Sequence, residues 1–171
     1  MPEDLKETAA GNHSSFTTKV ISFAELTVDE KIQAITGFPA GIEIYSVQRV
    51  RYHEGEALMI DHSYYRRDAV KGLTPEIAEQ SVYNYMEKVL GQRIVTTKRK
   101  ITVEPVTEID KMYLDLKEYN CMAVVSSCIY NGDGILFEFN QSRYRPDGFV
   151  FYDAAHPVKR EDHWLSMAAA I

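Results

Sequence analysis

Apolar and polar residues alternate with a period of two along much of the chain, as they do in β-strands with one buried face. The stretches with this pattern are residues 16–26, 42–53, 56–66, 93–103, 122–130, 135–145 and 149–153. Glu54-Gly55 and the Asn-Gly-Asp-Gly sequence of residues 131–134 each separate two such stretches and predict hairpins. Most strands are therefore expected to be antiparallel.

Helical spacing is clearest in residues 80–91. Ser81 predicts the N-terminal cap of this helix and Gly91 its left-handed end. An apolar stripe on one face consists of Val82, Tyr85, Met86, Val89 and Leu90. Thr74-Pro75 predicts a short helical turn that leads into this helix.

Three further helices are predicted. Residues 2–9 carry acidic groups in a first turn, and Thr27 with Glu30 forms a capping box for a helix that ends at Gly37. Thr107 caps the last helix with Asp110 nearby. Its apolar face would consist of Ile109, Met112, Tyr113 and Leu116. Helices among hairpin-linked strands predict an α+β fold, with one largely antiparallel sheet and helices packed on it.

The composition fits one domain with its own core. The chain has 171 residues, 45% of them hydrophobic, and we place the domain in residues 1–157 and a C-terminal tail in residues 158–171. A net charge of −6 argues against a chain that mainly grips nucleic-acid phosphates. Cys121 and Cys128 lack metal-ligand spacing and are expected to be free thiols. No apolar run reaches membrane length and the N-terminus is acidic, so a soluble, cytoplasmic protein without membrane contact is expected.

Two features point to an anion-binding site. Arg49 and Arg51 alternate in one strand, which places two guanidinium groups on one face of the sheet. The first turn of the helix at Ser81 offers unpaired backbone N–H groups, with the hydroxyl of Tyr83 beside them. The arginine pair alone is equally typical of exposed arginines, and most capping serines bind no ligand. Together they supply what a sugar phosphate requires, a charged fork and fixed N–H dipoles.

A third group of polar residues follows in residues 135–145. Glu138 and Tyr144 share one strand face with Asn140 and Ser142, and the opposite face carries Phe137 and Phe139. This is the pattern of an ordinary half-buried strand, and it would also suit recognition of sugar hydroxyls. Asp61 would join the group if the hairpin at Glu54-Gly55 had a three-residue loop, whereas a two-residue loop would turn it away.

Other motifs are weaker. Residues 98–100, Lys-Arg-Lys, could contact nucleic acid, but an alternating strand without stacking aromatics more often forms a charged sheet edge. The five histidines have no metal-ligand spacing, and no nucleophile or phosphate-loop motif occurs. We therefore expect no metal, no cofactor and no catalytic residues.

The order of these motifs resembles the UTRA domain, the effector-binding domain of GntR-type transcriptional repressors of the HutC branch. The resemblance extends over nearly the whole chain. It is carried by the RxR strand, DHSYY, SVYNYME, IxVEP, LDLKEY, MAVV and FxxxxSRYRPDxFxFxD in family order. The VEP, DLxxY and SRYR details resemble the trehalose-responsive members of the family.

The resemblance implies a chorismate lyase-like α+β fold and a homodimer whose effector loosens operator binding. It assigns phosphate binding to Arg49, Arg51, Ser81 and Tyr83, and hydroxyl recognition to Asp61, Glu138 and Tyr144. The implied effector is trehalose 6-phosphate, with glucosamine 6-phosphate as the alternative. The family's winged-helix DNA-binding domain is absent from this sequence, so DNA contact is expected only through such a domain.

Two other functions fit the same residues. A small lyase with this fold would use the arginines to bind the carboxylates of an acid such as chorismate, although no acid or base is evident. A purely structural dimerisation module would not need the arginines at all. The sensor hypothesis differs from both in requiring a ligand that binds one arrangement of the protein better than another.

Overall fold

The computed structural model describes residues 16–152. Six strands form one antiparallel sheet in the order β1-β2-β3-β6-β5-β4. Their bounds are β1 (Phe16–Thr27), β2 (Glu43–His53), β3 (Glu56–Arg66), β4 (Ile94–Pro105), β5 (Cys121–Asn131) and β6 (Leu136–Tyr144). The α+β prediction and both predicted hairpins are confirmed.

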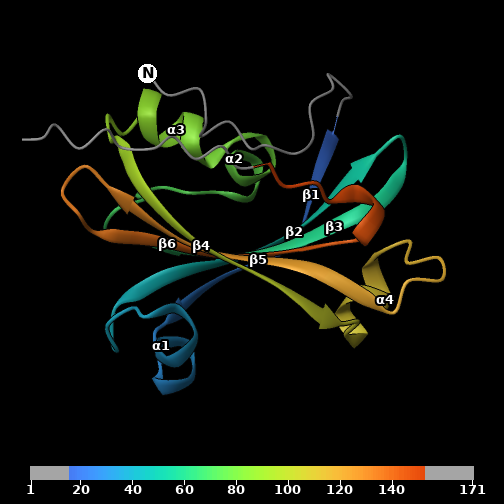
Figure 1. The fold of residues 1–171 in the computed structure, drawn as a ribbon. Helices are drawn as coiled ribbons and strands as arrows, with labels where there is room; N and C mark the ends of the chain where they lie inside the picture. Colours follow the sequence, from blue (N-terminus) through green and yellow to red (C-terminus); the bar gives the residue numbers. More distant parts are fainter. Residues whose placement is uncertain (1–15, 153–171) are drawn as a thin grey trace, which may run out of the picture.

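Four short helices cover the sheet on both faces (Figure 1). They are α1 (Glu30–Thr36), α2 (Pro75–Gln80), α3 (Val82–Lys88) and α4 (Glu108–Tyr113), and a 3₁₀ helix follows at Pro146–Gly148. In Figure 1, α2 and α3 lie above the sheet, whereas α1 and α4 lie below it at opposite ends. None of the helices in residues 16–152 has the length and apolar character needed to cross a bilayer.

Three apolar clusters hold these layers together. Under α2 and α3, Val82 and Met86 pack on Tyr65, Phe137 and their neighbours from the sheet. On the other face, one cluster surrounds Phe38 beside α1 and another surrounds Leu114 beside α4. Their buried members are Val28, Phe38, Ile44 and Phe139 for the first, and Val50, Ala57, Ile60, Leu114, Met122 and Val124 for the second. The sheet therefore has an apolar core on each face.

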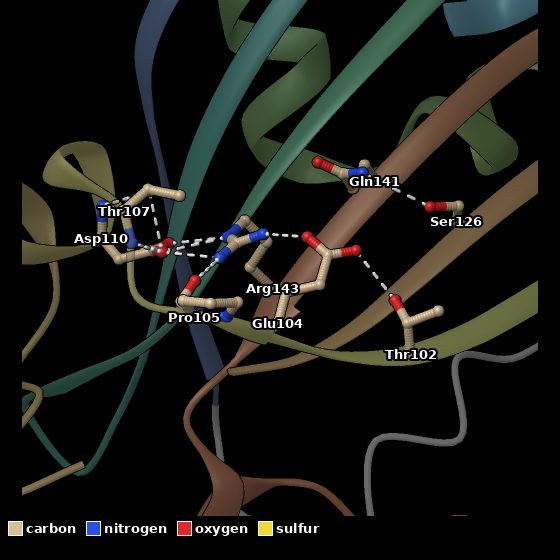
Figure 2. A network of polar contacts seen from close by, with 8 residues as sticks. All are labelled: Thr102, Glu104, Pro105, Thr107, Asp110, Ser126, Gln141 and Arg143. Atoms are coloured by element: carbon tan, nitrogen blue, oxygen red, sulfur yellow. Dashed lines mark hydrogen bonds and ion pairs between the residues drawn. The ribbon is translucent and has the colours of Figure 1, made fainter. Parts of the chain in front are cut away.

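A buried ion network fastens α4 to the sheet (Figure 2). Arg143 of β6 donates from Nε to both carboxylate oxygens of Asp110, at 3.0 Å each. Its Nη1 donates to Glu104 Oε2 and its Nη2 to the carbonyl oxygen of Pro105, both at 2.9 Å. Asp110 is fully buried and also completes the predicted capping box with Thr107. Polar contacts therefore anchor this helix where its short length limits apolar contact.

Several local predictions are wrong. Asp29, and not Thr27, caps α1, because Thr27 is still paired in β1 while Asp29 Oδ1 accepts from Ile32 N at 2.8 Å. The predicted apolar face of α4 is largely exposed: Ile109, Met112 and Tyr113 are 47%, 72% and 38% exposed. The helix has only six residues, and it is held by Asp110 and the following Leu114 instead.

The helix predicted at 80–91 is shorter than expected. It ends at Lys88, and Val89 is 67% exposed, so only part of the predicted stripe faces the core. Residues 149–152 form no strand, because the 3₁₀ helix redirects the chain and the ring of Phe149 packs 5.2 Å from that of Tyr144. The predicted helix at 2–9, the tail at 158–171 and the last residue of that strand lie outside the described residues.

The face predicted for Phe137 is also wrong. Phe137 packs with the apolar cluster under α2 and α3, whereas Phe139 packs with the cluster beside α1, on the opposite face of the sheet. The cause is a β-bulge: Ile129 pairs with Glu138 but Tyr130 pairs with Leu136, which leaves Phe137 as an extra residue. A bulge breaks strict alternation, so neighbouring side chains can share a face.

Candidate functional site

The predicted site residues of the sheet lie on the face covered by α2 and α3. Strand register aligns them in neighbouring rows across β2, β3 and β6. The rows are Arg51, Met59 and Tyr144; Arg49, Asp61 and Ser142; Val47, Ser63 and Asn140; and Tyr45, Tyr65 and Glu138. The predicted common face of Glu138, Asn140, Ser142 and Tyr144 agrees with this register.

A β-bulge decides where Asp61 points. The hairpin has the two-residue loop Glu54-Gly55, both with positive φ, and His53 pairs with Glu56. With that loop alone, Asp61 would face away from Arg49, as predicted for this case. The register shifts by one between Arg51 and Tyr52, however, so that Arg49 pairs with Asp61. Of the two loop lengths considered, the two-residue loop is present, and the expectation that it would turn Asp61 away is wrong because the bulge supplies the extra residue.

Asp61 forms ion pairs with both arginines. Arg49 donates to it through Nε at 2.9 Å and through Nη2 at 3.1 Å. Arg51 Nη2 donates to Asp61 Oδ2 at 3.3 Å. The side chains of Arg49, Arg51 and Asp61 are 9%, 12% and 1% exposed. The arginines thus share a face as predicted, but their guanidinium groups meet on a carboxylate of the protein itself and not at the first turn of α3.

Hydrogen bonds connect this ion cluster to its surroundings. Arg49 Nη1 donates to the carbonyl oxygen of Ala78 in α2 at 3.2 Å, and its Nη2 lies 3.4 Å from Ser63 Oγ. Asn140 donates to Ser63 Oγ at 2.8 Å and accepts from Ser142 Oγ at 2.8 Å. Arg49 therefore links the middle of the sheet to a carbonyl group of α2.

Glu138 is a buried carboxyl at the apolar end of the same face. Its side chain is 1% exposed, and its Oε2 has no hydrogen-bond partner among the described residues. Burial raises the pKa of Glu138 to about 7, against the opposing effects of Arg49 and of the hydroxyls of Tyr83 and Tyr65. The carboxyl can therefore act as a hydrogen-bond donor or acceptor near neutral pH.

Ser81 joins α2 to α3 as an extended residue. It ends α2 and caps α3, where its Oγ accepts from Asn84 N at 3.2 Å, so the predicted cap is confirmed. Ser81 and Tyr83 are both half-buried. The hydrogen bond with Tyr83 that lowers the pKa of Glu138 places the start of α3 over the Glu138 end of the face.

Sequence reasoning missed Ser63 and Tyr65 as members of the site. Both follow Asp61 at alternating positions of β3, and that spacing could have identified them. The cluster is closed in this structure. A hollow of about 440 Å³ adjoins this face at Tyr45. It is lined by Ile42, Glu43, Tyr45, Arg67, Asp68, Lys71 and Gly72 and includes none of the predicted site residues. We assign the site from the buried ion cluster, because the hollow lacks comparable buried polar groups.

This fold, with its buried arginine pair, is that of an effector-binding domain. The model of the UTRA domain matches residues 12–150, which shows that the chain belongs to this family. The chain is 40% identical over 117 residues to the HTH-type transcriptional regulator TreR of Bacillus subtilis, covering 68% of this chain and 49% of TreR. It is 30% identical over 133 residues to the regulator GmuR of the same organism, covering 78% of this chain and 56% of GmuR.

Solved structures agree with this assignment. The effector-binding domain of the B. subtilis trehalose repressor (TreR) matches with a TM-score of 0.77 and 36% identity, over 84% of this chain and 99% of that domain. The effector domain of PhnF from Mycobacterium smegmatis, at 19% identity, shares the fold with a TM-score of 0.72, over 84% of this chain and 88% of that one. The chain spans about half the length of the curated relatives TreR and GmuR. It is an effector-binding domain of the GntR-type regulators, and these relatives favour a regulatory role over a lyase.

Proposed function

We propose that this domain senses a sugar phosphate, trehalose 6-phosphate in the first instance and glucosamine 6-phosphate as the alternative. In this proposal the domain acts in the cytoplasm as part of a homodimeric repressor that contacts DNA through a separate winged-helix domain. The observation that carries the proposal is the pair Arg49 and Arg51, held side by side within a closed polar cluster of one sheet face. Likeness to TreR supports the choice of sugar.

The proposal assigns the site residues two chemical tasks, and residues of both kinds occur at both ends of the face, since Tyr144 shares a row with Arg51 and Tyr83 lies by Glu138. Arg49 and Arg51 provide the charge that a phosphate group needs, and Ser81 and Tyr83 at the junction of α2 and α3 add hydroxyl groups. Glu138 and Tyr144 recognise sugar hydroxyls, and the buried Oε2 of Glu138 is one atom available for this contact. Asp61 was expected to act in the same way, but its carboxylate is already bonded to the arginines.

Ligand entry requires a conformational change, because the arginine side chains are about one-tenth exposed. The contact between Arg49 Nη1 and Ala78 connects the ion cluster to α2. An anion that draws Arg49 away from Ala78 would release α2 and favour a second arrangement of the helices. An effector shifts the equilibrium between the two arrangements only if it binds the second arrangement more tightly than the first.

Isothermal titration with trehalose 6-phosphate and with trehalose tests the proposal. We expect heat only with the phosphorylated sugar, and we expect Arg51→Ala to weaken binding by at least about tenfold, since a hydrogen bond to a charged group contributes about 1.5–3 kcal/mol. Arg99→Ala is the matched control, because Arg99 is an exposed arginine of β4. Equal heats for the two sugars would contradict the phosphate-binding role.

A further inference from the structure

Asp61 is placed as an anion that both arginines share. Its Oδ1 accepts from Arg49 Nε, and its Oδ2 accepts from Arg49 Nη2 and from Arg51 Nη2, at 2.9, 3.1 and 3.3 Å. The side chain is 1% exposed. Two guanidinium groups that share the oxygens of one buried anion form the arrangement that also suits a phosphate group.

This geometry leaves Asp61 with little capacity to bind sugar hydroxyls while both arginines hold it. A carboxylate has about four lone-pair positions, and three N–H groups of the arginines already point at it. The bulge between Arg51 and Tyr52 is what turns Asp61 to this face, because the two-residue hairpin loop alone would turn it away. The local fold therefore brings this carboxylate to the arginines.

We propose that Asp61 is an internal counter-ion that orients Arg49 and Arg51 and gives up at least one of them to the anionic group of the effector. The inference rests on the proposed function for the identity of the natural ligand. It makes Asp61 a positioning residue, which acts on the ligand through the two guanidinium groups.

The exchange also explains discrimination against weakly charged ligands. Arg49, Arg51 and Asp61 together carry one net positive charge. An incoming group must compete with a buried carboxylate for the same N–H donors, which a phosphate dianion does better than a neutral hydroxyl. Asp61 thus sets the minimum charge that a ligand needs in order to enter.

The variant Asp61→Asn tests this inference with inorganic sulfate and phosphate as probes at constant ionic strength. We expect Asp61→Asn to bind sulfate at least about tenfold more tightly than the unmodified chain, because the competing and repelling charge is gone. Asp61→Glu, which restores the charge, should bind sulfate nearly as the unmodified chain does. Asp133→Asn is the matched control, since Asp133 is an exposed aspartate in the turn between β5 and β6, and it should leave sulfate binding unchanged.

The direction in which Asp61→Asn changes the affinity for sulfate separates a counter-ion role from a merely structural one. If Asp61 only supported the fold, its loss would weaken or leave unchanged the binding of sulfate, and either result would overturn the inference. If Asp61→Asn does not fold, a crystal structure of the unmodified chain with bound sulfate tests the same exchange directly. A sulfate oxygen in place of Asp61 on Arg51 Nη2 supports the exchange, and a sulfate bound while Asp61 keeps both arginines overturns it.

Titration of the unmodified chain with trehalose 6-phosphate keeps the two proposals distinct. Absence of binding there would overturn the proposed function, whereas the inorganic anions would still report on Asp61. Binding of trehalose 6-phosphate without tighter sulfate binding by Asp61→Asn would overturn the inference about Asp61 alone.

Discussion

Arg143→Met is expected to lower the free energy of unfolding by about 3–5 kcal/mol, the loss typical when one partner of a buried ion pair is removed. Asp110 is fully buried and loses three of its hydrogen bonds, and Glu104 and the carbonyl of Pro105 each lose one. Methionine retains much of the apolar stem, so the effect isolates the guanidinium group. Urea unfolding followed by circular dichroism measures the change.

Lys111→Met is the matched control for this prediction. Lys111 lies on α4, the helix that carries Asp110, and pairs with Glu108 at 2.7 Å, but both side chains are more than half exposed. An exposed pair of this kind contributes at most about 1 kcal/mol. Similar losses for Arg143→Met and Lys111→Met would show that the network of Figure 2 does not hold α4 to the sheet.

Glu138→Gln makes the stability of the domain less dependent on pH. The pKa of Glu138 is raised by burial from 4.5 to about 7, so the folded state holds the proton more strongly than the unfolded chain. The stabilisation from this proton is complete below the unfolded pKa and is lost as pH rises through the folded pKa. The free energy of unfolding that is lost between these two pKa values is on the order of 3 kcal/mol, since one pKa unit corresponds to about 1.4 kcal/mol.

Unfolding in urea at about pH 5 and about pH 8.5 tests this expectation. Glutamine resembles the protonated acid, so the variant should equal the unmodified chain at the lower pH and exceed its stability by up to roughly 3 kcal/mol at the higher one. Glu118→Gln, which changes an exposed glutamate, should leave the pH profile unchanged. Parallel profiles for Glu138→Gln and the unmodified chain would show that Glu138 does not keep its proton on folding.

Alternation in the sequence was enough to predict which candidate site residues share a face within one strand. Arg49 and Arg51 share a face because no bulge falls between them. Glu138 and Tyr144 lie on the same face of β6 because no register shift interrupts residues 138–144. The Lys-Arg-Lys run at residues 98–100 lies on β4 at the edge of the sheet, as the charged-edge interpretation predicts.

The ion pairs of the arginines could not be predicted in the same way. The bulge beside Arg51 has no glycine or proline to mark it, and it reverses the side to which Asp61 points. The bulge that displaces Phe137 is equally unmarked. A one-residue shift changes every later side-chain direction in a strand, so pairings across a hairpin depend on an event that hydrophobic alternation does not record.

The two helices above the arginines have six and seven residues and meet at the extended Ser81. Helices of this length do not persist without contacts to the rest of the protein. Val20 N donates to Glu79 at 2.9 Å, and Ala78 accepts from Arg49, so a few polar contacts help to hold α2 in place. If α2 must open for the ligand to enter, as proposed above, the observed association rate should level off at high ligand concentration. How quickly the domain responds to its ligand would then be determined by this opening step and no longer by the supply of the ligand.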